Sequence, residues 1–306
     1  MLSSRPQDED SVCAPPRVAS MRLTSRVWGR VAIPAVLALT LAACHLGGPS
    51  IVSPQRNIEA FSFQVALGPQ QFQIEGYLAR SAEPGRLPGM LVLNGGQTDA
   101  QRCIETSQGL VAMGIHVACV SIPGYGRSSG PSRFVGPQAV ATARRALDLL
   151  AARPDVDPSR IAVWGLGDGA MAAGLLMDYD ARPRALILQS GAYDTLSLWP
   201  QAPLGTKLAI LRQVWPSKRV LSERSVIRHL PARIDCSVLI LHGERDRSMP
   251  VSQAVRLASA LRKRGARVEA FYFPQAPHDL GRRVEPELRA FLRQNLLASM
   301  GRATAS

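Results

Sequence analysis

The sequence predicts an α/β fold with a mostly parallel sheet of about eight strands and helices on both faces. Short apolar runs without polar alternation recur along the chain, and amphipathic helical patterns separate them. Such runs indicate strands buried on both faces, which is typical of parallel sheets whose connections are helices. The 306 residues are 46% apolar, enough to bury one large core, so we expect a single folded domain.

The elements follow in chain order from this pattern. Two alternating segments on either side of Gly68-Pro69 predict an antiparallel hairpin. The predicted strands are residues 60–67, 72–78, 90–93, 115–121, 161–164, 185–189, 238–241 and 268–273. The predicted helices are residues 99–113, 137–152, 169–177, 251–264 and 285–297. The mixed pattern around Trp199-Pro200 and Trp215-Pro216 predicts a small helical cap, at about 192–233, inserted in a domain spanning 59–300.

The first 43 residues indicate export instead of a folded element. From Met21 the chain carries three arginines and no acid, followed by an apolar run too short for a comfortable transmembrane helix. We expect translation to begin at Met21, because the acidic residues 8–10 do not suit an export signal.

The run Leu41-Ala42-Ala43-Cys44 resembles the lipobox of bacterial lipoproteins. That resemblance implies cleavage before Cys44, a lipid on its thiol and a membrane-attached protein of the cell envelope, with residues 44–58 as a linker. His45 at the next position, where an aspartate would retain the protein elsewhere, implies an outer-membrane location facing the periplasm.

Charge and cysteine usage exclude several functions. The net charge of +13 is scattered along the chain, which argues against a nucleic-acid partner, because a groove for nucleic acid would need clustered charge with some interleaved aromatic residues. Three cysteines remain after the predicted lipid site: Cys103, Cys119 and Cys236. Their odd number and irregular spacing predict neither a metal site nor a disulfide framework, so we expect buried thiols, with one bridge as the alternative. Nothing in the sequence calls for a cofactor.

Candidate chemistry lies in the loops that follow the predicted strands, where open α/β sheets place their sites. Asn94-Gly95-Gly96-Gln97 follows one strand, and Gly165-Leu166-Gly167-Asp168-Gly169 lies between a strand and a helix. His242-Gly243-Glu244-Arg245-Asp246 follows a later strand, and Pro277-His278-Asp279 follows the last one. An aspartate and a histidine so placed suit a pair in which the carboxylate orients the imidazole as a general base.

These motifs resemble the α/β-hydrolase superfamily over residues 60–298. The phrase RPDVDPSRIAVWG, residues 153–165, and the position of the cap are most similar to the dienelactone-hydrolase and prolyl-oligopeptidase-like branches. The resemblance implies a nucleophile elbow G-x-S-x-G at residues 165–169, a catalytic acid at Asp246 and a catalytic histidine at His278. It also implies an oxyanion hole formed by Gly96, Gln97 and Asp168, and an architectural role for Pro123-Gly124-Tyr125-Gly126-Arg127-Ser128.

Position 167 departs from that pattern, because a glycine stands where the family places its serine. The elbow nucleophile adopts a strained backbone with positive φ, and glycine adopts it without strain. Asp168 does not replace the serine, since its side chain is expected to point away from the direction of residue 167.

Three functions remain open from the sequence. The first is a hydrolase of small esters, other acyl compounds or peptides that uses Ser190, Ser121 or a water activated by His278 and Asp246. The second is a catalytically silent relative that keeps the fold and pocket to bind a ligand or partner. The third, a dinucleotide-binding oxidoreductase, would use Gly165-x-Gly167-x-x-Ala170 as its fingerprint, but that motif normally opens its domain and the next strand ends in Gln189 instead of an acid.

Overall fold

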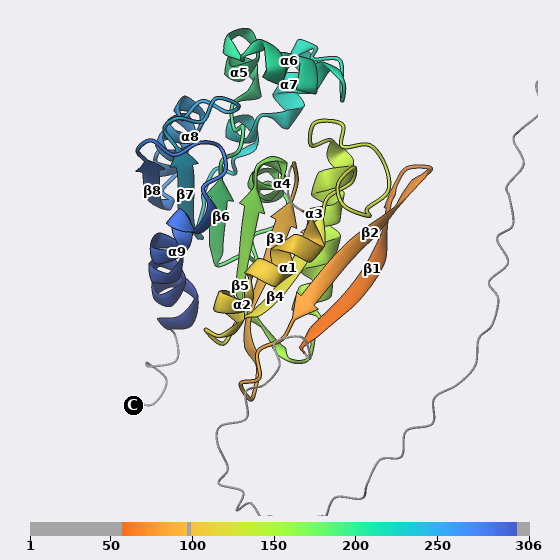
Figure 1. Cartoon of the computed structure of the whole chain (residues 1–306), viewed down its shortest axis with the longest axis vertical. Helices are drawn as coiled ribbons and strands as arrows, with labels where there is room; N and C mark the ends of the chain where they lie inside the picture. Colours follow the sequence, from red (N-terminus) through yellow and green to blue (C-terminus); the bar gives the residue numbers. More distant parts are fainter. Residues whose placement is uncertain (1–56, 97–98, 299–306) are drawn as a thin grey trace, which may run out of the picture. The chain divides into compact units, whose positions relative to one another are not determined.

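The computed structural model describes residues 57–96 and 99–298, which form an eight-stranded sheet with the order β1-β2-β4-β3-β5-β6-β7-β8. Strands β3 to β8 are parallel, while β1 pairs antiparallel with β2 and β2 pairs antiparallel with β4 (Figure 1). The strands are β1 (Ile58–Leu67), β2 (Gln70–Ala79), β3 (Leu87–Asn94), β4 (His116–Ser121), β5 (Val156–Leu166), β6 (Ala185–Gln189), β7 (Ser237–Gly243) and β8 (Arg267–Phe273). The predicted fold class is therefore confirmed.

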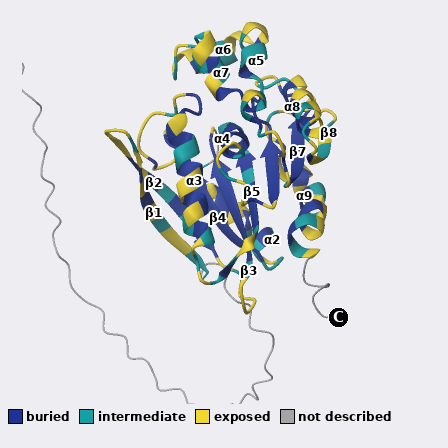
Figure 2. Cartoon of the chain, turned by 180° about the vertical axis from the view of Figure 1, so that it is seen from behind, coloured by how far each residue is buried: buried dark blue, intermediate teal, exposed yellow. Residues whose placement is uncertain are grey.

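Helices cover both faces of this sheet, as the views from the front and from behind show (Figures 1 and 2). One face carries α1 (Ala100–Thr106), α2 (Gln108–Val111), α9 (Glu285–Leu292) and the π-helical turn η3 (Arg293–Leu297). The other face carries α3 (Pro137–Ala151), α4 (Asp168–Leu176) and α8 (Ser252–Arg262). Two separate clusters of buried apolar side chains result, one on each face of the sheet.

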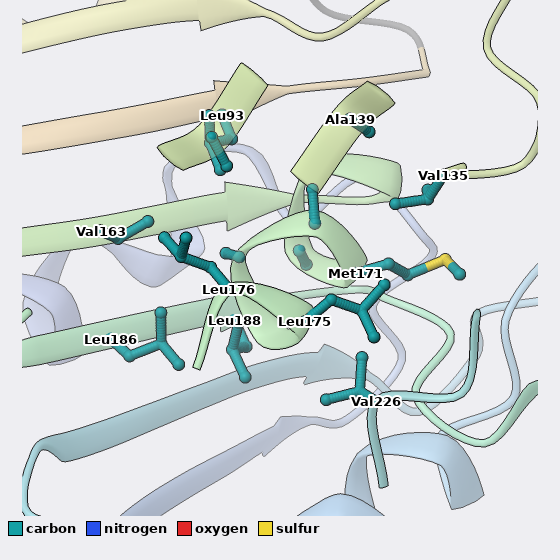
Figure 3. Close-up of a cluster of buried hydrophobic side chains, with 14 of the residues drawn as sticks. Leu93, Val135, Ala139, Val163, Met171, Leu175, Leu176, Leu186, Leu188 and Val226 are labelled. Atoms are coloured by element: carbon teal, nitrogen blue, oxygen red, sulfur yellow. The ribbon is translucent and has the colours of Figure 1, made fainter. Parts of the chain in front are cut away.

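The core around α4 holds the elbow in place. Leu93, Val163, Leu186 and Leu188 project from three central strands toward α4, where they meet its apolar side chains (Figure 3). All α4 residues from Gly169 to Leu176 are buried. Because α4 is enclosed on every side, the residues at its N-terminus have a fixed position.

The predicted helix at residues 99–113 is broken in the structure into α1 and α2 at Ser107. The hydroxyl of Thr106 donates to the carbonyl of Cys103 at 2.9 Å, and that of Ser107 donates to the same carbonyl at 2.7 Å. Side-chain hydroxyls that bond to backbone carbonyls compete with regular helix hydrogen bonds. Thr106 and Ser107 both make such bonds, and the first helix ends at these two residues.

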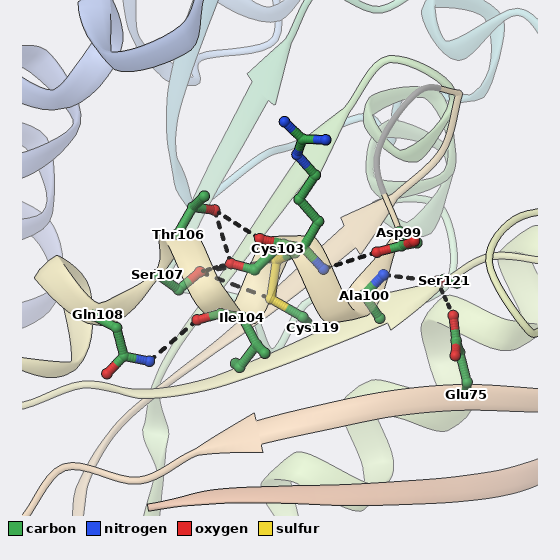
Figure 4. The surroundings of a disulfide bond; sticks show 11 residues. Glu75, Asp99, Ala100, Cys103, Ile104, Thr106, Ser107, Gln108, Cys119 and Ser121 are labelled. Carbon is green, nitrogen blue, oxygen red and sulfur yellow. Dashed lines mark hydrogen bonds between the residues drawn. A yellow bond between two sulfur atoms is a disulfide. The ribbon is translucent and has the colours of Figure 1, made fainter. Parts of the chain in front are cut away.

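Cys103 on α1 and Cys119 on β4 form a disulfide with a Cα–Cα distance of 6.0 Å (Figure 4). The expectation of buried thiols is thus wrong for these two residues, and the alternative of one bridge is correct. Folding brings them together because α1 packs against β4, which sequence spacing alone does not show. Cys236 is an unpaired cysteine in the described part of the chain, and burial raises the pKa of its thiol to about 11.

The segment predicted as a cap contains four short helices: α5 (Thr195–Gln201), α6 (Leu204–Leu211), α7 (Lys218–Arg224) and the 3-10 turn η1 (Val226–His229). Helices α5 to α7 lie beyond the carboxyl ends of the parallel strands (Figure 1). Across the described residues, none of the helices combines the length and apolarity needed to cross a membrane. The predicted signal segment and Cys44 lie outside the described residues.

Candidate active site

Gly167 forms the sharp turn between β5 and α4, with φ +56° and ψ −117°. A Cβ atom at Gly165 would lie 2.3 Å from the carbonyl oxygen of Gly169, and one at Gly169 would lie 2.0 Å from that of Leu93. The two outer glycines therefore allow the strand, the turn and the helix to approach closely. The positive φ of Gly167 is a conformation that costs a residue with a Cβ about 1–3 kcal/mol.

The space beside Gly167 is open toward His278. A Cβ atom built at residue 167 would lie 3.6 Å from the carbonyl oxygen of Gly95 and 3.9 Å from Nε2 of His278, both ordinary contacts. A hydroxyl oxygen one bond beyond that Cβ could therefore reach hydrogen-bond distance of Nε2. The local geometry is that of a nucleophile position, although the residue there supplies no nucleophile.

His278 and Asp246 are brought together from the loops after β8 and β7. Nδ1 of His278 lies 2.6 Å from Oδ2 of Asp246. Oδ1 of Asp246 accepts hydrogen bonds from the backbone N–H groups of Ser248 and Met249, each at 2.8 Å. The carboxylate is thus fixed by its own loop, and it in turn orients the imidazole so that Nε2 faces residue 167.

A second histidine, His242, also contacts the Asp246 carboxylate. His242, at the end of β7, is fully buried, and its Nε2 lies 2.8 Å from the carbonyl oxygen of Met249 and 3.4 Å from Oδ2 of Asp246. Both it and Asp246 were visible in one sequence motif, but the motif alone assigned a role only to the aspartate. The signal in the sequence was their spacing of four residues, because a short loop of that length can fold back so that Asp246 contacts His242 at the strand end.

The electrostatics of the pair favour an ionised aspartate and a basic imidazole. The hydrogen bond to Asp246 raises the pKa of His278, and burial of the ring only partly offsets that effect. Burial acts to raise the pKa of Asp246, but hydrogen bonds with His242, His278 and the Met249 N–H hold it far below its usual range. Asp246 therefore stays charged at neutral pH, and His278 can take up a proton readily.

Two of the three predicted oxyanion donors lie in the same cavity as Gly167. Gly96, with φ +80°, and Asp168, the first residue of α4, both line the same small cavity as His278. The backbone N–H of Asp168 belongs to the first helical turn, where N–H groups have no partner within the helix. Gln97, the third predicted donor, lies outside the described residues.

The Asp168 side chain has a partner that the sequence did not reveal. Its Oδ2 accepts a hydrogen bond from the Tyr125 hydroxyl, which comes from the loop after β4. Burial raises the pKa of the Asp168 carboxyl, and the bond from Tyr125 and the charge of His278 offset only part of that rise. Burial and the nearby Asp168 also raise the pKa of Tyr125. The motif around Tyr125 suggested architecture, and its hydroxyl does hold one wall of the site.

The two serines considered as displaced nucleophiles are engaged elsewhere. Ser190 Oγ donates to the backbone carbonyl of His278 at 2.9 Å, and Ser121 Oγ donates to Glu75 at 2.8 Å while accepting from the N–H of Ala100. Ser190 has φ +53°, which is unusual for a residue with a Cβ. Its contact ties the end of β6 to the histidine loop, so it acts as a positioning residue.

Together these groups enclose a cavity of about 220 Å³ at the carboxyl ends of the strands. It brings together Gly96, Gly167, Asp168 and His278, and Asp246 lies behind the imidazole. Within residues 57–96 and 99–298, no group of three or more His, Cys, Asp or Glu side chains is placed to hold a metal ion. The arrangement suits acid–base chemistry, with His278 as the base.

Comparisons with known proteins find similar chains among peptidases and esterases. The chain is 30% identical over 139 residues to the uncharacterized peptidase YuxL of Bacillus subtilis, an alignment that covers 44% of this chain and only 21% of that protein. A puromycin-hydrolyzing peptidase of Mycobacterium tuberculosis shares the fold with a TM-score of 0.64 and 23% identity, covering 78% of this chain and 39% of the other. An acetyl xylan esterase of Paenibacillus sp. R4 has a TM-score of 0.65 and 19% identity, with 80% and 86% coverage.

The family assignment rests on a direct match. Residues 135–296, more than half of the 306-residue chain, match the prolyl oligopeptidase family, and this span contains the elbow, the aspartate loop and the histidine loop. The sheet order and the solved structures place the same region in the α/β-hydrolase fold. The chain therefore belongs to the prolyl oligopeptidase family.

Proposed function

We propose that this protein is an acyl hydrolase of esters or peptides in which His278 and Asp246 activate a water molecule for direct attack on the substrate carbonyl. The observation that carries the proposal is the intact pair, with Nδ1 of His278 2.6 Å from Asp246 and Nε2 directed at the open space beside Gly167. That space is where the family's serine hydroxyl would lie, so a water there is within reach of the base.

The chemistry balances without a covalent intermediate. Nε2 of His278 accepts a proton from water as the water oxygen bonds to the carbonyl carbon, and Asp246 stabilises the resulting imidazolium. The N–H groups near Gly96 and Asp168 would bind the oxyanion that forms. The imidazolium then returns the proton to the departing alcohol or amine, which leaves a carboxylic acid and the free base.

The missing nucleophile limits the expected rate. When a member of a Ser-His-Asp triad is removed, roughly 10³–10⁴-fold acceleration over water remains from the other groups. We therefore expect slow turnover, readily seen only with activated substrates. The similarity to a peptidase and to an acetyl xylan esterase supports peptides and acetyl esters as the substrate classes to examine first.

The test is hydrolysis of p-nitrophenyl acetate by the purified protein beside an identically prepared Asp246→Ala/His278→Ala variant. We expect turnover above the double variant, no pre-steady-state burst and no labelling by a serine-directed phosphonate. Equal rates for the two proteins would refute the hydrolase proposal. A burst or labelling would instead show a side-chain nucleophile and refute the water mechanism.

A second candidate is a catalytically silent protein that uses the pocket for binding. Gly167 itself favours it, because glycine removes both the nucleophile and the backbone strain of the elbow. This candidate predicts no turnover by the natural protein, yet saturable binding of a substrate-like ester or peptide that the Asp246→Ala/His278→Ala variant weakens.

We further propose that the protein is exported and attached to the outer membrane through a lipid on Cys44. The lipobox-like run before Cys44 supports this, and the Cys103–Cys119 disulfide suits an oxidising compartment such as the periplasm. Mass spectrometry of the protein isolated from its cells should find a mature N-terminus at a lipid-modified Cys44. An unmodified Cys44 in the isolated protein would refute the proposal.

A further inference from the structure

A second and larger cavity lies on the face of the sheet that carries α1 and α9. Its volume is about 590 Å³, within the range of sites that bind small molecules. Helix α1 and the residue after it, Ser107, form one side near the disulfide (Figure 4), and α9 with the turn before it forms the other. Leu166, Gln189 and Asp279 separate it from the cavity that contains His278, since they line both.

Three residues that line this cavity carry buried polar atoms that lack partners. Both side-chain amide atoms of Asn94, Nε1 of Trp164 and Oε1 of Gln189 are buried and have no hydrogen-bond partner among the described residues. Asn94 is fully buried, and Gln189 is 6% exposed. Buried polar groups in native proteins are almost always paired, so four unpaired atoms on three residues that line one cavity point to a ligand that pairs them when these side chains turn toward it.

The sheet register places these atoms in a defined pattern. Asn94 on β3 is in register with Leu166 on β5, and Leu166 is in register with Gln189 on β6. Neighbours in register point to the same face, and strands lie about 4.8 Å apart, so Asn94 and Gln189 are about 10 Å apart with Leu166 between them. Trp164, two residues before Leu166, shares that face.

The pattern of donors and acceptors matches two amide groups. The side chain of Asn94 has an N–H donor next to a carbonyl acceptor, so it can pair with the carbonyl and the N–H of a ligand amide. Trp164 offers a second donor and Gln189 a second acceptor. Between them the floor is apolar at Leu166, and Val92 and Leu288 also line the cavity.

The charges near the cavity do not select for a charged ligand. Its lining includes three arginines and three acidic residues: Arg102, Arg282, Arg289, Glu105, Asp279 and Glu285. Arg282 and Glu285 lie 3.9 Å apart as an ion pair. The lining is thus balanced in charge, whereas a site for an anion would show an excess of arginine.

We propose that this cavity binds an uncharged, peptide-like molecule whose two amide groups flank an apolar side chain. One amide pairs with Asn94, the other pairs with Trp164 and Gln189, and the apolar group packs on Leu166. The site is distinct from the Asp246–His278 pair, and binding there does not depend on whether the protein is a hydrolase.

The experiment is calorimetric titration of the full chain with N-acetyl-L-phenylalaninamide, an uncharged compound with two amides and a benzyl group. We expect saturable binding with a Kd of about 1 mM or tighter. Asn94→Leu and Trp164→Phe should each weaken binding about tenfold, because each leaves a ligand amide group unpaired. Asn94→Leu should also raise the melting temperature of the free protein, because it removes two unpaired buried polar atoms.

Three controls keep the outcome decisive. Trp199→Phe and Asn295→Leu make the same exchanges outside the cavity and should leave the Kd unchanged. Thr106→Trp changes an exposed residue in the cavity lining and should block binding without unfolding the protein. The proposal is overturned if the natural protein shows no saturable binding up to about 10 mM. It is also overturned if Asp246→Ala/His278→Ala abolishes binding while Asn94→Leu does not.

Discussion

Gly167 has the backbone conformation of a nucleophile elbow but lacks the nucleophilic side chain that the elbow normally carries. Its φ is +56°. A Cβ atom built there would make only ordinary contacts within 4 Å, with the carbonyl oxygen of Gly95 and with Nε2 of His278. A substitution at 167 thus meets backbone strain but no steric barrier.

We predict that Gly167→Ser creates or sharply raises esterase activity and lowers stability. The serine hydroxyl would lie within reach of Nε2 of His278, which supplies the one group that the site lacks. The free energy of unfolding should fall by roughly 1–3 kcal/mol, because a Cβ is placed at positive φ. Ester hydrolysis, phosphonate labelling and urea denaturation measure the two effects.

Gly68→Ser is the matched control for that variant. Gly68 has φ +57° and open space around its Cβ position, but it lies in the turn between β1 and β2. The Gly68→Ser variant should lose about as much free energy of unfolding as Gly167→Ser and gain no esterase activity. If Gly167→Ser neither hydrolyses activated esters nor reacts with the phosphonate, no competent hydrolase site surrounds residue 167.

We predict that the activity of Gly167→Ser rises with pH and has its midpoint above about 6.5, the usual pKa of histidine. Only neutral His278 can accept a proton, and the hydrogen bond to Asp246 raises its pKa. Asp246→Asn removes that charge, so it should lower both the midpoint and the maximal rate. A profile of kcat/KM against pH tests this, and a midpoint at or below 6.5 in the Gly167→Ser protein would contradict it.

Sequence motifs could predict the residues at strand ends but not the contacts between loops. Gly167, Asp246 and His278 were predictable because each follows a strand in a fixed chain order. The bond from Tyr125 to Asp168 and that from Ser190 to the His278 carbonyl join loops far apart in the sequence. Such contacts depend on the packing of the whole sheet, which no local pattern encodes.

At the scale of elements, the disulfide attaches α1 to β4 beside the large cavity. Its two cysteines are 16 residues apart, and closing a loop of that size is expected to stabilise the fold by about 3 kcal/mol. We predict that Cys103→Ser/Cys119→Ser lowers the free energy of unfolding by about 2–4 kcal/mol. Urea denaturation measures the loss. Cys236→Ser should show no comparable loss, and reducing agent should destabilise the natural protein but not the double variant.

Helix α6 of the cap contacts the core through a single buried residue. Ile210 is 2% exposed, whereas Leu204 is 72% exposed and Leu208 is 45% exposed. We predict that Ile210→Ala costs about 2–5 kcal/mol, as large-to-small changes in a core do. Leu204→Ala should stay within about 0.5 kcal/mol, as surface changes do. Equal losses in denaturation experiments would show that the apolar face of α6 is covered in solution.

The boundaries of elements were less predictable than their existence. Each of the eight strands was expected at a position that overlaps the observed one, because buried apolar runs are strong local signals, although β5 begins five residues before its predicted start. The break at Ser107 and the π-helical turn at Arg293–Leu297 were not expected. Both interrupt a helical pattern that continues in the sequence, so only the hydrogen bonds of the folded chain locate them.

At the scale of the whole molecule, residues within 57–298 bury both faces of the sheet. One cluster packs α3, α4 and α8 against the strands, and the other packs α1 and α9. The folded domain should therefore have its full stability without the N-terminal segment.

We predict that a chain beginning at residue 57 unfolds in urea with the same free energy as the full chain, within about 0.5 kcal/mol, and with the same dependence on urea concentration. Both core clusters are composed of residues that this shorter chain keeps, so the surface buried on folding should not change. The slope of the transition is the decisive measurement, because it scales with the surface that unfolding exposes. A smaller slope together with a loss above about 2 kcal/mol would mean that the N-terminal segment packs on the domain, and the linker assigned to residues 44–58 would then be wrong.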